Sequence, residues 1–156
     1  MIRIAYASVK DLQRILEIMH DAISPIWTSD AFLSEMRKGD SLFLVALDDE
    51  IVDIETGSPR CMGFAVVRQV GDDGELLQIA VDTKVRRGGI GSLLIEAVLD
   101  YAAKNSMQSV FLEVRKSNIA AISLYEKNGF EPVRTRKDYY DNPDEDAMVM
   151  KRVIGA

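Results

Sequence analysis

A basic, glycine-rich turn separates an apolar run from an amphipathic stretch, and its residue types suit an anion site. The turn is Arg86-Arg87-Gly88-Gly89-Ile90-Gly91, with Ser92 directly after it. Apolar spacing predicts a strand before the turn and a helix that starts inside it. Free backbone N–H groups at a helix N-terminus bind anions, and glycine lets a phosphate approach where a Cβ would obstruct it. The turn therefore predicts a phosphate site, with a plain glycine-rich turn and solvated arginines as the alternative.

The glycine spacing separates this turn from the two common nucleotide loops. The Gly-Lys-Ser/Thr ending of a P-loop is absent, and so is the glycine triplet of a dinucleotide fold. The turn instead fits the pattern Arg/Gln-x-x-Gly-x-Gly, with Arg86, Gly89 and Gly91 at the fixed positions.

A second segment combines a carboxylate and a phenol. Residues 110–115 alternate like a strand, with Glu113 among hydrophobic residues, and Asn118 then opens a helical pattern that carries Tyr125 and ends at Gly129. A partly desolvated carboxylate can act as a base, and a phenol can donate a proton. Residue type alone favours a solvent-facing strand position for Glu113, and it leaves Tyr125 open as a packed aromatic residue.

These two segments together resemble the motifs of the GCN5-related N-acetyltransferase (GNAT) family. In that family, a loop similar to residues 86–91 receives the pyrophosphate of acetyl-CoA. A helix of the pattern Asn-x-x-Ala-x-x-x-Tyr lies beside the CoA arm, and Asn118, Ala121 and Tyr125 match it position by position. The resemblance implies acetyl-CoA as acetyl donor, no metal, and direct acetyl transfer to a primary amine.

The resemblance also implies roles for individual residues. Glu113 matches the glutamate that serves as base, and Tyr125 matches the acid that protonates the departing CoA sulfur. Cys61 stands outside every motif, which argues against an acetyl-cysteine intermediate. The expected cofactor contacts are Ile79, Ala80, Val81, Arg86, Arg87, Gly88, Gly89, Ile90, Gly91, Ser92, Asn118, Ala121 and Tyr125.

Residues 25–32 and 134–140 look like segments of bacterial ribosomal-protein-alanine N-acetyltransferases, and the similarity extends from Ile2 to Lys151. In that subfamily these segments flank the substrate groove, and the substrate is the N-terminal alanine of a small-subunit ribosomal protein. The expected acceptor contacts are Trp27, Gln78, Glu113, Tyr139 and Tyr140. The alternatives are a helix staple for Trp27 and a strand-end aromatic pair for the two tyrosines.

An α-amine acceptor agrees with acid–base chemistry. Roughly one N-terminus in ten is neutral at pH 7, against roughly one lysine in two thousand. Three features depart from the subfamily: Gln78 replaces Asn or Thr, Gly88 replaces a common arginine, and residues 48–59 are longer than expected. A protein lysine or a small-molecule amine such as a polyamine therefore remains open as acceptor. A non-catalytic acetyl-CoA-binding module would not need both Glu113 and Tyr125.

The elements that must position these residues form a mixed α/β pattern. Strands are expected at residues 2–6, 42–47, 62–70, 75–81, 109–115, 131–137 and 146–153, and helices at residues 9–19, 28–38, 89–104 and 118–128. The third helix is expected to bury Leu93 and Leu94 alike. Residues 48–59 are too long for a tight turn and are expected to be a mobile excursion. Without repeats or linkers, residues 1–156 are expected to form a single N-acetyltransferase domain, with a mostly antiparallel mixed sheet of about seven strands and about four helices.

Composition narrows the partners. The formal charge of −6 and the pI near 4.8 argue against nucleic-acid binding and suit a basic protein N-terminus, although such charge also simply favours solubility. Cys61 and His20 are the only residues of their types, which excludes an internal disulfide, a thiolate metal cluster and most histidine-based sites. Short apolar runs and a start unlike a signal peptide lead us to expect a cytoplasmic protein without a membrane partner.

Overall fold

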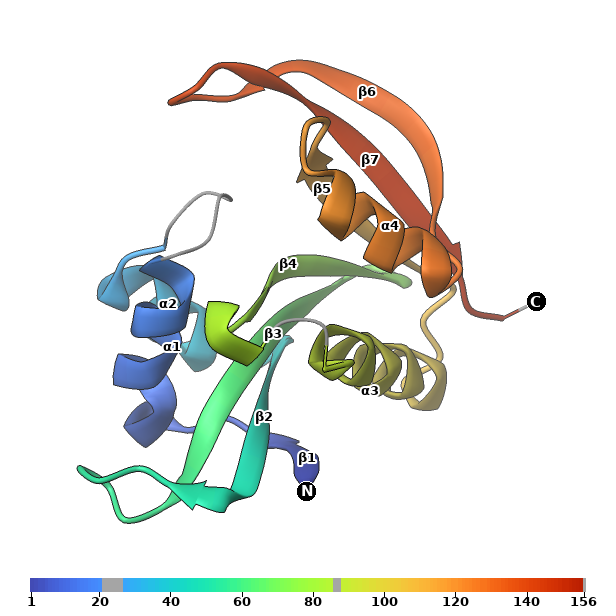
Figure 1. Cartoon of the computed structure of the whole chain (residues 1–156). Helices are drawn as coiled ribbons and strands as arrows, with labels where there is room; N and C mark the ends of the chain where they lie inside the picture. Colours follow the sequence, from blue (N-terminus) through green and yellow to red (C-terminus); the bar gives the residue numbers. More distant parts are fainter. Residues whose placement is uncertain (21–26, 86–87, 156) are drawn as a thin grey trace.

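Seven strands pair into one sheet in the computed structural model, which describes residues 1–20, 27–85 and 88–155 (Figure 1). The strands are β1 (Ile2–Tyr6), β2 (Ser41–Val52), β3 (Pro59–Val70), β4 (Asp73–Val81), β5 (Ser109–Arg115), β6 (Glu131–Tyr140) and β7 (Glu145–Val153). The helices are α1 (Leu12–His20), α2 (Ser29–Arg37), α3 (Ile90–Lys104) and α4 (Ile119–Lys127), with 3₁₀ turns η1 (Val9–Asp11) and η2 (Thr83–Val85). The expected fold class is confirmed.

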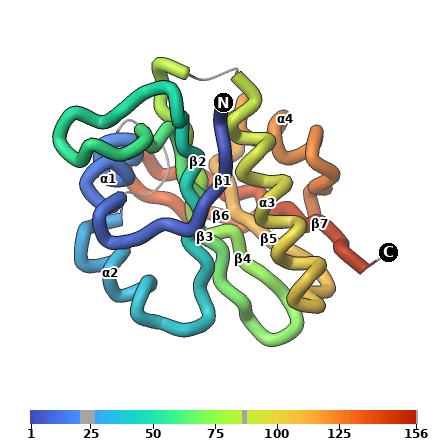
Figure 2. Tube along the Cα trace, turned by 90° about the horizontal axis from the view of Figure 1, so that it is seen from below, coloured from blue at the N-terminus to red at the C-terminus, as the bar shows by residue number. Residues whose placement is uncertain are grey.

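The sheet order is β1-β2-β3-β4-β5-β7-β6, and β4–β5 is the parallel pair in an otherwise antiparallel set. Figure 2 shows α1 and α2 on one side of the sheet and α3 and α4 on the other. Strand β3 supplies both cores by alternation, because Phe64 and Val66 pack towards α1 and α2 whereas Ala65 and Val67 pack towards α3. The sheet is therefore the middle of three layers.

Short polar side chains and glycines set the helix ends. Thr28 accepts a hydrogen bond from the Ala31 amide at 3.1 Å and begins α2. Asn118 accepts from the Ala121 amide at 3.2 Å and begins α4. Gly129, with φ of +87°, ends that helix in the left-handed conformation that glycine favours.

The expectation of a mobile excursion at residues 48–59 was wrong. Strand β2 continues to Val52, which pairs with Pro59 at the start of β3, so the two strands form one long hairpin. The Asp53 amide donates to the Ser58 carbonyl at 2.8 Å and closes its tip. Apolar alternation does not predict this extension, because the side chains at the end of β2 are exposed while the backbone pairing continues.

Strand β6 also extends beyond its expected end. It runs to Tyr140, past the expected end at residue 137, so Tyr139 and Tyr140 lie at the end of a strand. The β6–β7 register shifts between Arg136 and Tyr140, and Asp138 has a φ of +52° in that interval. Because of this irregularity, the side chains do not alternate strictly, and a prediction based on alternation ends the strand too early.

The parallel pairing of β4 with β5 is short. It runs from Asp73 opposite Ser109 to Leu76 opposite Leu112. Beyond Leu76, β4 remains paired with β3 as far as Val81, while the rest of β5 remains paired with β7. The sheet therefore forks at this point, and the fork positions the site described below.

Two adjacent leucines of α3 allow a test of the core. Leu94 is fully buried between α3 and the sheet, whereas Leu93 is 37% exposed, contrary to the expectation that both are buried. We expect Leu94→Ala to lower the free energy of unfolding by about 2–5 kcal/mol and Leu93→Ala by less than about 1 kcal/mol. Urea unfolding monitored by circular dichroism measures both values. Equal losses would contradict this placement of α3.

Candidate functional site

A cavity of about 510 Å³ opens where β4 and β5 part. All five residues that were expected to contact the acceptor line it, and they come from four separate segments. These residues are Trp27, Gln78, Glu113, Tyr139 and Tyr140. Sequence patterning could not show this convergence, because Trp27 precedes α2 and the two tyrosines end β6.

Glu113 is the first β5 residue beyond the last pair with β4, so its side chain stands at the fork. Its Oε2 atom is buried and has no hydrogen-bond partner in the part of the chain that the structure describes. Its Oε1 atom lies 3.8 Å from Nε of Arg136, whose side chain is 44% exposed. Such a carboxylate can accept a proton, or it can accept hydrogen bonds from an ammonium group that enters the cavity.

The two cavity tyrosines are phenols that stay protonated at neutral pH. A hydrogen bond to Glu113, together with burial, raises the pKa of Tyr139. Burial, with the nearby charge of Glu113, raises the pKa of Tyr140 to about 12. Their rings meet edge to face with centroids 5.0 Å apart. The pair therefore offers hydrogen-bond donors and an apolar wall beside the carboxylate.

Tyr125 lies apart from this cavity. It is buried on α4, with its ring 5.9 Å from that of Phe130, and it is not among the lining residues. Burial, with a smaller effect of Tyr140, raises the pKa of its phenol well above the usual range. The structure thus gives Tyr125 a packing role and leaves it protonated, as a proton donor must be.

The predicted phosphate turn lies at the start of α3. Gly89 is its N-cap with φ of +80°, and no side chain of the described residues makes a capping hydrogen bond there. The first backbone N–H groups of α3 are therefore suited to an anion. Arg86 and Arg87 lie outside the described residues.

Helices α3 and α4 come together beside that turn. A Cβ on Gly91 would lie 2.9 Å from the Leu124 side chain, so glycine permits this close approach. The Asn128 amide donates to the Ser92 hydroxyl at 3.4 Å. The two motif-bearing segments are thus neighbours in space, although the Asn118 side chain is already used to cap α4.

Residues 79–81 form the arm of β4 beyond the fork. Val81, Ala80 and Ile79 pair with β3 through Gly63, Phe64 and Ala65, respectively. On the other edge, no strand of the described chain pairs with them. An open strand edge presents N–H and C=O groups that an extended ligand can use.

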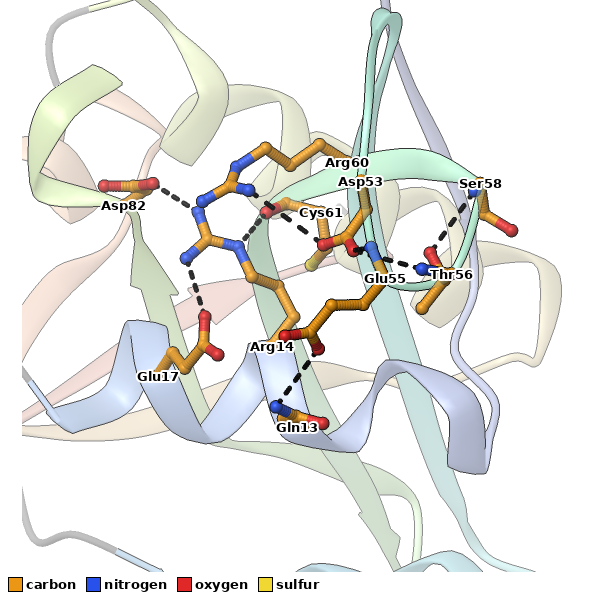
Figure 3. Close-up of polar contacts among 10 residues, drawn as sticks. All are labelled: Gln13, Arg14, Glu17, Asp53, Glu55, Thr56, Ser58, Arg60, Cys61 and Asp82. Atoms are coloured by element: carbon orange, nitrogen blue, oxygen red, sulfur yellow. Dashed lines mark hydrogen bonds and ion pairs between the residues drawn. The ribbon is translucent and has the colours of Figure 1, made fainter.

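Arg14 of α1 holds the end of this arm, a feature that sequence reasoning missed (Figure 3). Its guanidinium pairs with Asp82 and donates to the Cys61 carbonyl at 2.9 Å. The Asp82 carboxylate also accepts from the Lys84 amide at 2.9 Å. Burial alone would raise the pKa of Asp82, but the Lys84 amide and Arg14 outweigh it and keep that pKa below its ordinary value. A helical arginine otherwise looks like a solvated residue, so only the fold reveals this contact.

The long β2–β3 hairpin packs against the same helix (Figure 3). Gln13 donates to Glu55 at the hairpin tip at 3.4 Å, and Arg60 pairs with Asp53 at 3.9 Å. Arg60 also contributes to the low pKa of Asp82. The hairpin therefore belongs to the support of the β4 arm. No cluster of three His, Cys, Asp or Glu side chains that could hold a metal occurs among the described residues.

Comparison with known proteins gives a consistent result. The model of the acetyltransferase (GNAT) family matches residues 9–130. The [ribosomal protein bS18]-alanine N-acetyltransferase of Escherichia coli is 40% identical over 97 residues, which span 61% of this chain and 66% of that protein, slightly under two thirds of its length. The N-alpha-acetyltransferase of Sulfurisphaera tokodaii is 34% identical over 155 residues, or 95% of this chain and 90% of that protein.

Solved structures extend the likeness to the whole chain. The crystal structure of the ribosomal-protein-S18-alanine N-acetyltransferase from E. coli has a TM-score of 0.85 and 31% identity, and the match covers 100% of this chain and 96% of that one. Arabidopsis thaliana NAA60 in complex with acetyl-CoA has a TM-score of 0.87 over 100% of both chains. At 21% identity, the latter likeness concerns the fold alone.

The Arg14–Asp82 contact generates a test of the β4 arm. We expect Asp82→Asn to lower the free energy of unfolding at pH 7 by about 1–3 kcal/mol, because a partly buried charge-assisted contact is lost. The native pKa of Asp82 lies below the unfolded value of 3.8, so its contribution is present above pH 3.8 and is lost as the pH falls through the native pKa. The difference between variant and wild type should therefore narrow below about pH 4.

Urea unfolding between pH 7 and pH 3 measures this difference. The control is Asp49→Asn, which removes an exposed ion pair with Arg3 and should cost less than about 1 kcal/mol. A difference that is independent of pH, or an equal loss in the control, would rule out the supporting role of Asp82.

Proposed function

The chain belongs to the acetyltransferase (GNAT) family, and we propose from this that it transfers the acetyl group of acetyl-CoA directly to the N-terminal amine of a protein. We further propose that the acceptor is the N-terminal alanine of a ribosomal protein, as the name of the E. coli relative states for that enzyme. The chain would act as a single catalytic domain, and such an acceptor implies a cytoplasmic enzyme. No helix of the described residues has the length and apolarity needed to cross a membrane.

One observation carries the proposal: Glu113 stands at the fork, between the acceptor cavity and the open edge of β4. The cavity approaches the fork from the side of Trp27 and the two tyrosines. The β4 arm leads from the fork towards the uncapped start of α3. Two substrates that enter from these two directions meet beside one carboxylate, and this arrangement is what direct transfer requires.

The residues present suit acetyl-CoA as the donor. The uncapped α3 N-terminus with Gly89 in the left-handed conformation suits the pyrophosphate, and Arg86 and Arg87 would add charge. The open edge at residues 79–81 suits the amide groups of the pantetheine arm, which pair as a strand would. When bound, the cosubstrate supplies an activated acetyl thioester. Amide groups of the same edge would polarise its carbonyl oxygen.

Proton transfers complete the chemistry. Glu113 takes the proton of the acceptor ammonium, directly or through a water molecule, and the neutral amine can then attack the thioester carbonyl. Tyr125 donates its phenolic proton to the departing sulfur as the C–S bond breaks, and it is available for this because its phenol is protonated at neutral pH. The cavity tyrosines orient the peptide beside Glu113.

An α-amine is the acceptor that this chemistry favours. A single carboxylate deprotonates an N-terminus with a pKa of about 8 more readily than a lysine with a pKa of about 10.4. The aromatic wall of Trp27 and Tyr139 suits an extended peptide more than a free polyamine. The formal charge of −6 favours a basic acceptor protein.

Three basic peptides test the proposal by CoA-thiol release with acetyl-CoA. One has a free N-terminal alanine, one has a blocked N-terminus and an internal lysine, and one has neither amine. We expect turnover with the free alanine alone. Turnover with the lysine peptide would reassign the acceptor to a side-chain amine. Acetyl-CoA binding without any peptide turnover would indicate a small-molecule acceptor or a non-catalytic module.

Glu113→Gln tests the base with the same assay. We expect kcat to fall by about 10²- to 10⁴-fold with unchanged affinity for acetyl-CoA, because the amide cannot accept the ammonium proton. Glu131→Gln is the matched control, since Glu131 is exposed on β6 and does not line the cavity. Wild-type turnover by Glu113→Gln across the pH range would remove Glu113 as the base.

A further inference from the structure

Arg115 ends β5 two residues after Glu113 and lies on the same face of the strand. It is a buried cation, 4% exposed. A buried guanidinium destabilises the fold unless its N–H groups find acceptors, so the partners of Arg115 indicate what it holds in place.

Those partners lie on the turn between β6 and β7. The two terminal nitrogens donate to the carbonyls of Pro143 at 2.8 Å and Asp141 at 2.9 Å. The guanidinium carbon lies 4.5 Å from the centroid of the Tyr140 ring. Arg115 thus contacts the end of β6 and both sides of the turn, and its planar group donates to two carbonyls of the turn at once.

A third partner extends this contact to α4. Nη1 of Arg115 lies 3.4 Å from Oε1 of Glu145, the first residue of β7. Glu145 also accepts from the Ser117 amide at 2.7 Å and from the Ser117 hydroxyl at 3.0 Å. These hydrogen bonds, led by that of the Ser117 hydroxyl, keep the pKa of Glu145 below its ordinary value, so its carboxylate is ionised at neutral pH. Ser117 directly precedes Asn118, the N-cap of the helix that carries Tyr125.

The turn needs such a contact because β6 is an edge strand. Among the described residues, β6 pairs with β7 and with no other strand, and all of its residues except Tyr140 are exposed. The β6–β7 register is also interrupted between Arg136 and Tyr140. Pairing alone would therefore leave Tyr139 and Tyr140 poorly fixed relative to Glu113 on β5.

We propose that Arg115 is a positioning residue for acceptor binding: through the turn at residues 141–144 and through Glu145, it fixes Tyr139 and Tyr140 opposite Glu113. The proposal rests on the proposed acetyl transfer and deepens it. It predicts an effect on the KM for the acceptor, because loss of Arg115 displaces Tyr139 and Tyr140. The β4 edge at residues 79–81, which is proposed to bind acetyl-CoA, lies on the other arm of the fork and should not move.

The experiment compares Arg115→Met and Arg115→Lys with the control Arg152→Met. Arg152 also donates to a backbone carbonyl, that of Asn128 at 3.3 Å, but it lies at the opposite end of β7. We expect Arg115→Met to raise the KM for the alanine peptide about tenfold or more, with the KM for acetyl-CoA within about twofold of wild type. Arg115→Lys should be intermediate, because lysine retains the charge but cannot bridge two carbonyls in a plane.

Near-ultraviolet circular dichroism of the unliganded variants gives a readout that needs no turnover. Tyr139 and Tyr140 form a close edge-to-face pair, so their tyrosine signal should weaken in Arg115→Met and persist in Arg152→Met. All assays are made below the melting temperature of each variant.

Equal changes in both KM values, or an effect no larger than that of Arg152→Met, would show a purely structural residue and overturn the proposal. An unchanged tyrosine signal in Arg115→Met would overturn it as well. If wild type acetylated no peptide, the proposed function and the acceptor role would fail together, while the circular dichroism would still report whether Arg115 holds the tyrosine pair.

Discussion

The structure depends on one interruption of backbone pairing: β4 and β5 part after Leu76 and Leu112. Each strand continues beyond that point with a different neighbour, so the sheet opens into two arms. Opening a ladder inside a domain leaves N–H and C=O groups without partners, which is unfavourable unless a ligand or water satisfies them. At the same opening lie the cavity lined by Glu113, the β4 edge at residues 79–81 and Glu113 itself, directly after the last β4–β5 pair. The candidate site and the interruption of the β4–β5 pairing are therefore the same structural feature.

An arginine makes polar contacts at each arm of the fork, partly buried Arg14 at the β4 arm and buried Arg115 at the β5 arm. Arg14 ties the end of the β4 arm to α1 through Asp82, and Arg115 ties the β6–β7 turn to the end of β5. Both use guanidinium groups to satisfy backbone carbonyls as well as carboxylates. Two open arms would otherwise be free to move apart or to close. The long β2–β3 hairpin adds to the first support through its contact with α1.

The sequence predicted what depends on local chemistry. The start of α3 within the described part of the glycine-rich turn, the start of a helix near Asn118 and the alternation of β5 all correspond to observed elements. The sequence-based prediction was wrong where backbone pairing between strands, and not the alternation of apolar side chains, determines how far a strand extends. Residues 48–59 continue a hairpin whose side chains are mostly exposed, and β6 continues through an irregular register to Tyr140. Leu93 was expected in the core because helical periodicity cannot separate two adjacent positions at the border of an apolar face.

Long-range polar contacts were beyond the reach of sequence patterning. Arg14 and Asp82 are 68 residues apart, and each looks like an ordinary solvated residue of its segment. Arg115 lies on the same strand face as Glu113, for which residue type alone favoured a solvent-facing position, yet Arg115 is buried against the β6–β7 turn. The catalytic roles of Glu113 and Tyr125 and the acetyl-CoA contacts remain predictions, since they concern bound substrates.

In the proposed reaction, the open edge of β4 and the start of α3 hold acetyl-CoA, and the acceptor enters the cavity on the other side of the fork. Amide hydrogen exchange of the chain with and without saturating acetyl-CoA tests it directly. We expect protection of the amides at residues 79–81 and 88–92, with little change at Tyr139 and Tyr140. Protection confined to β6 and the cavity tyrosines, with residues 79–81 and 88–92 unchanged, would contradict it.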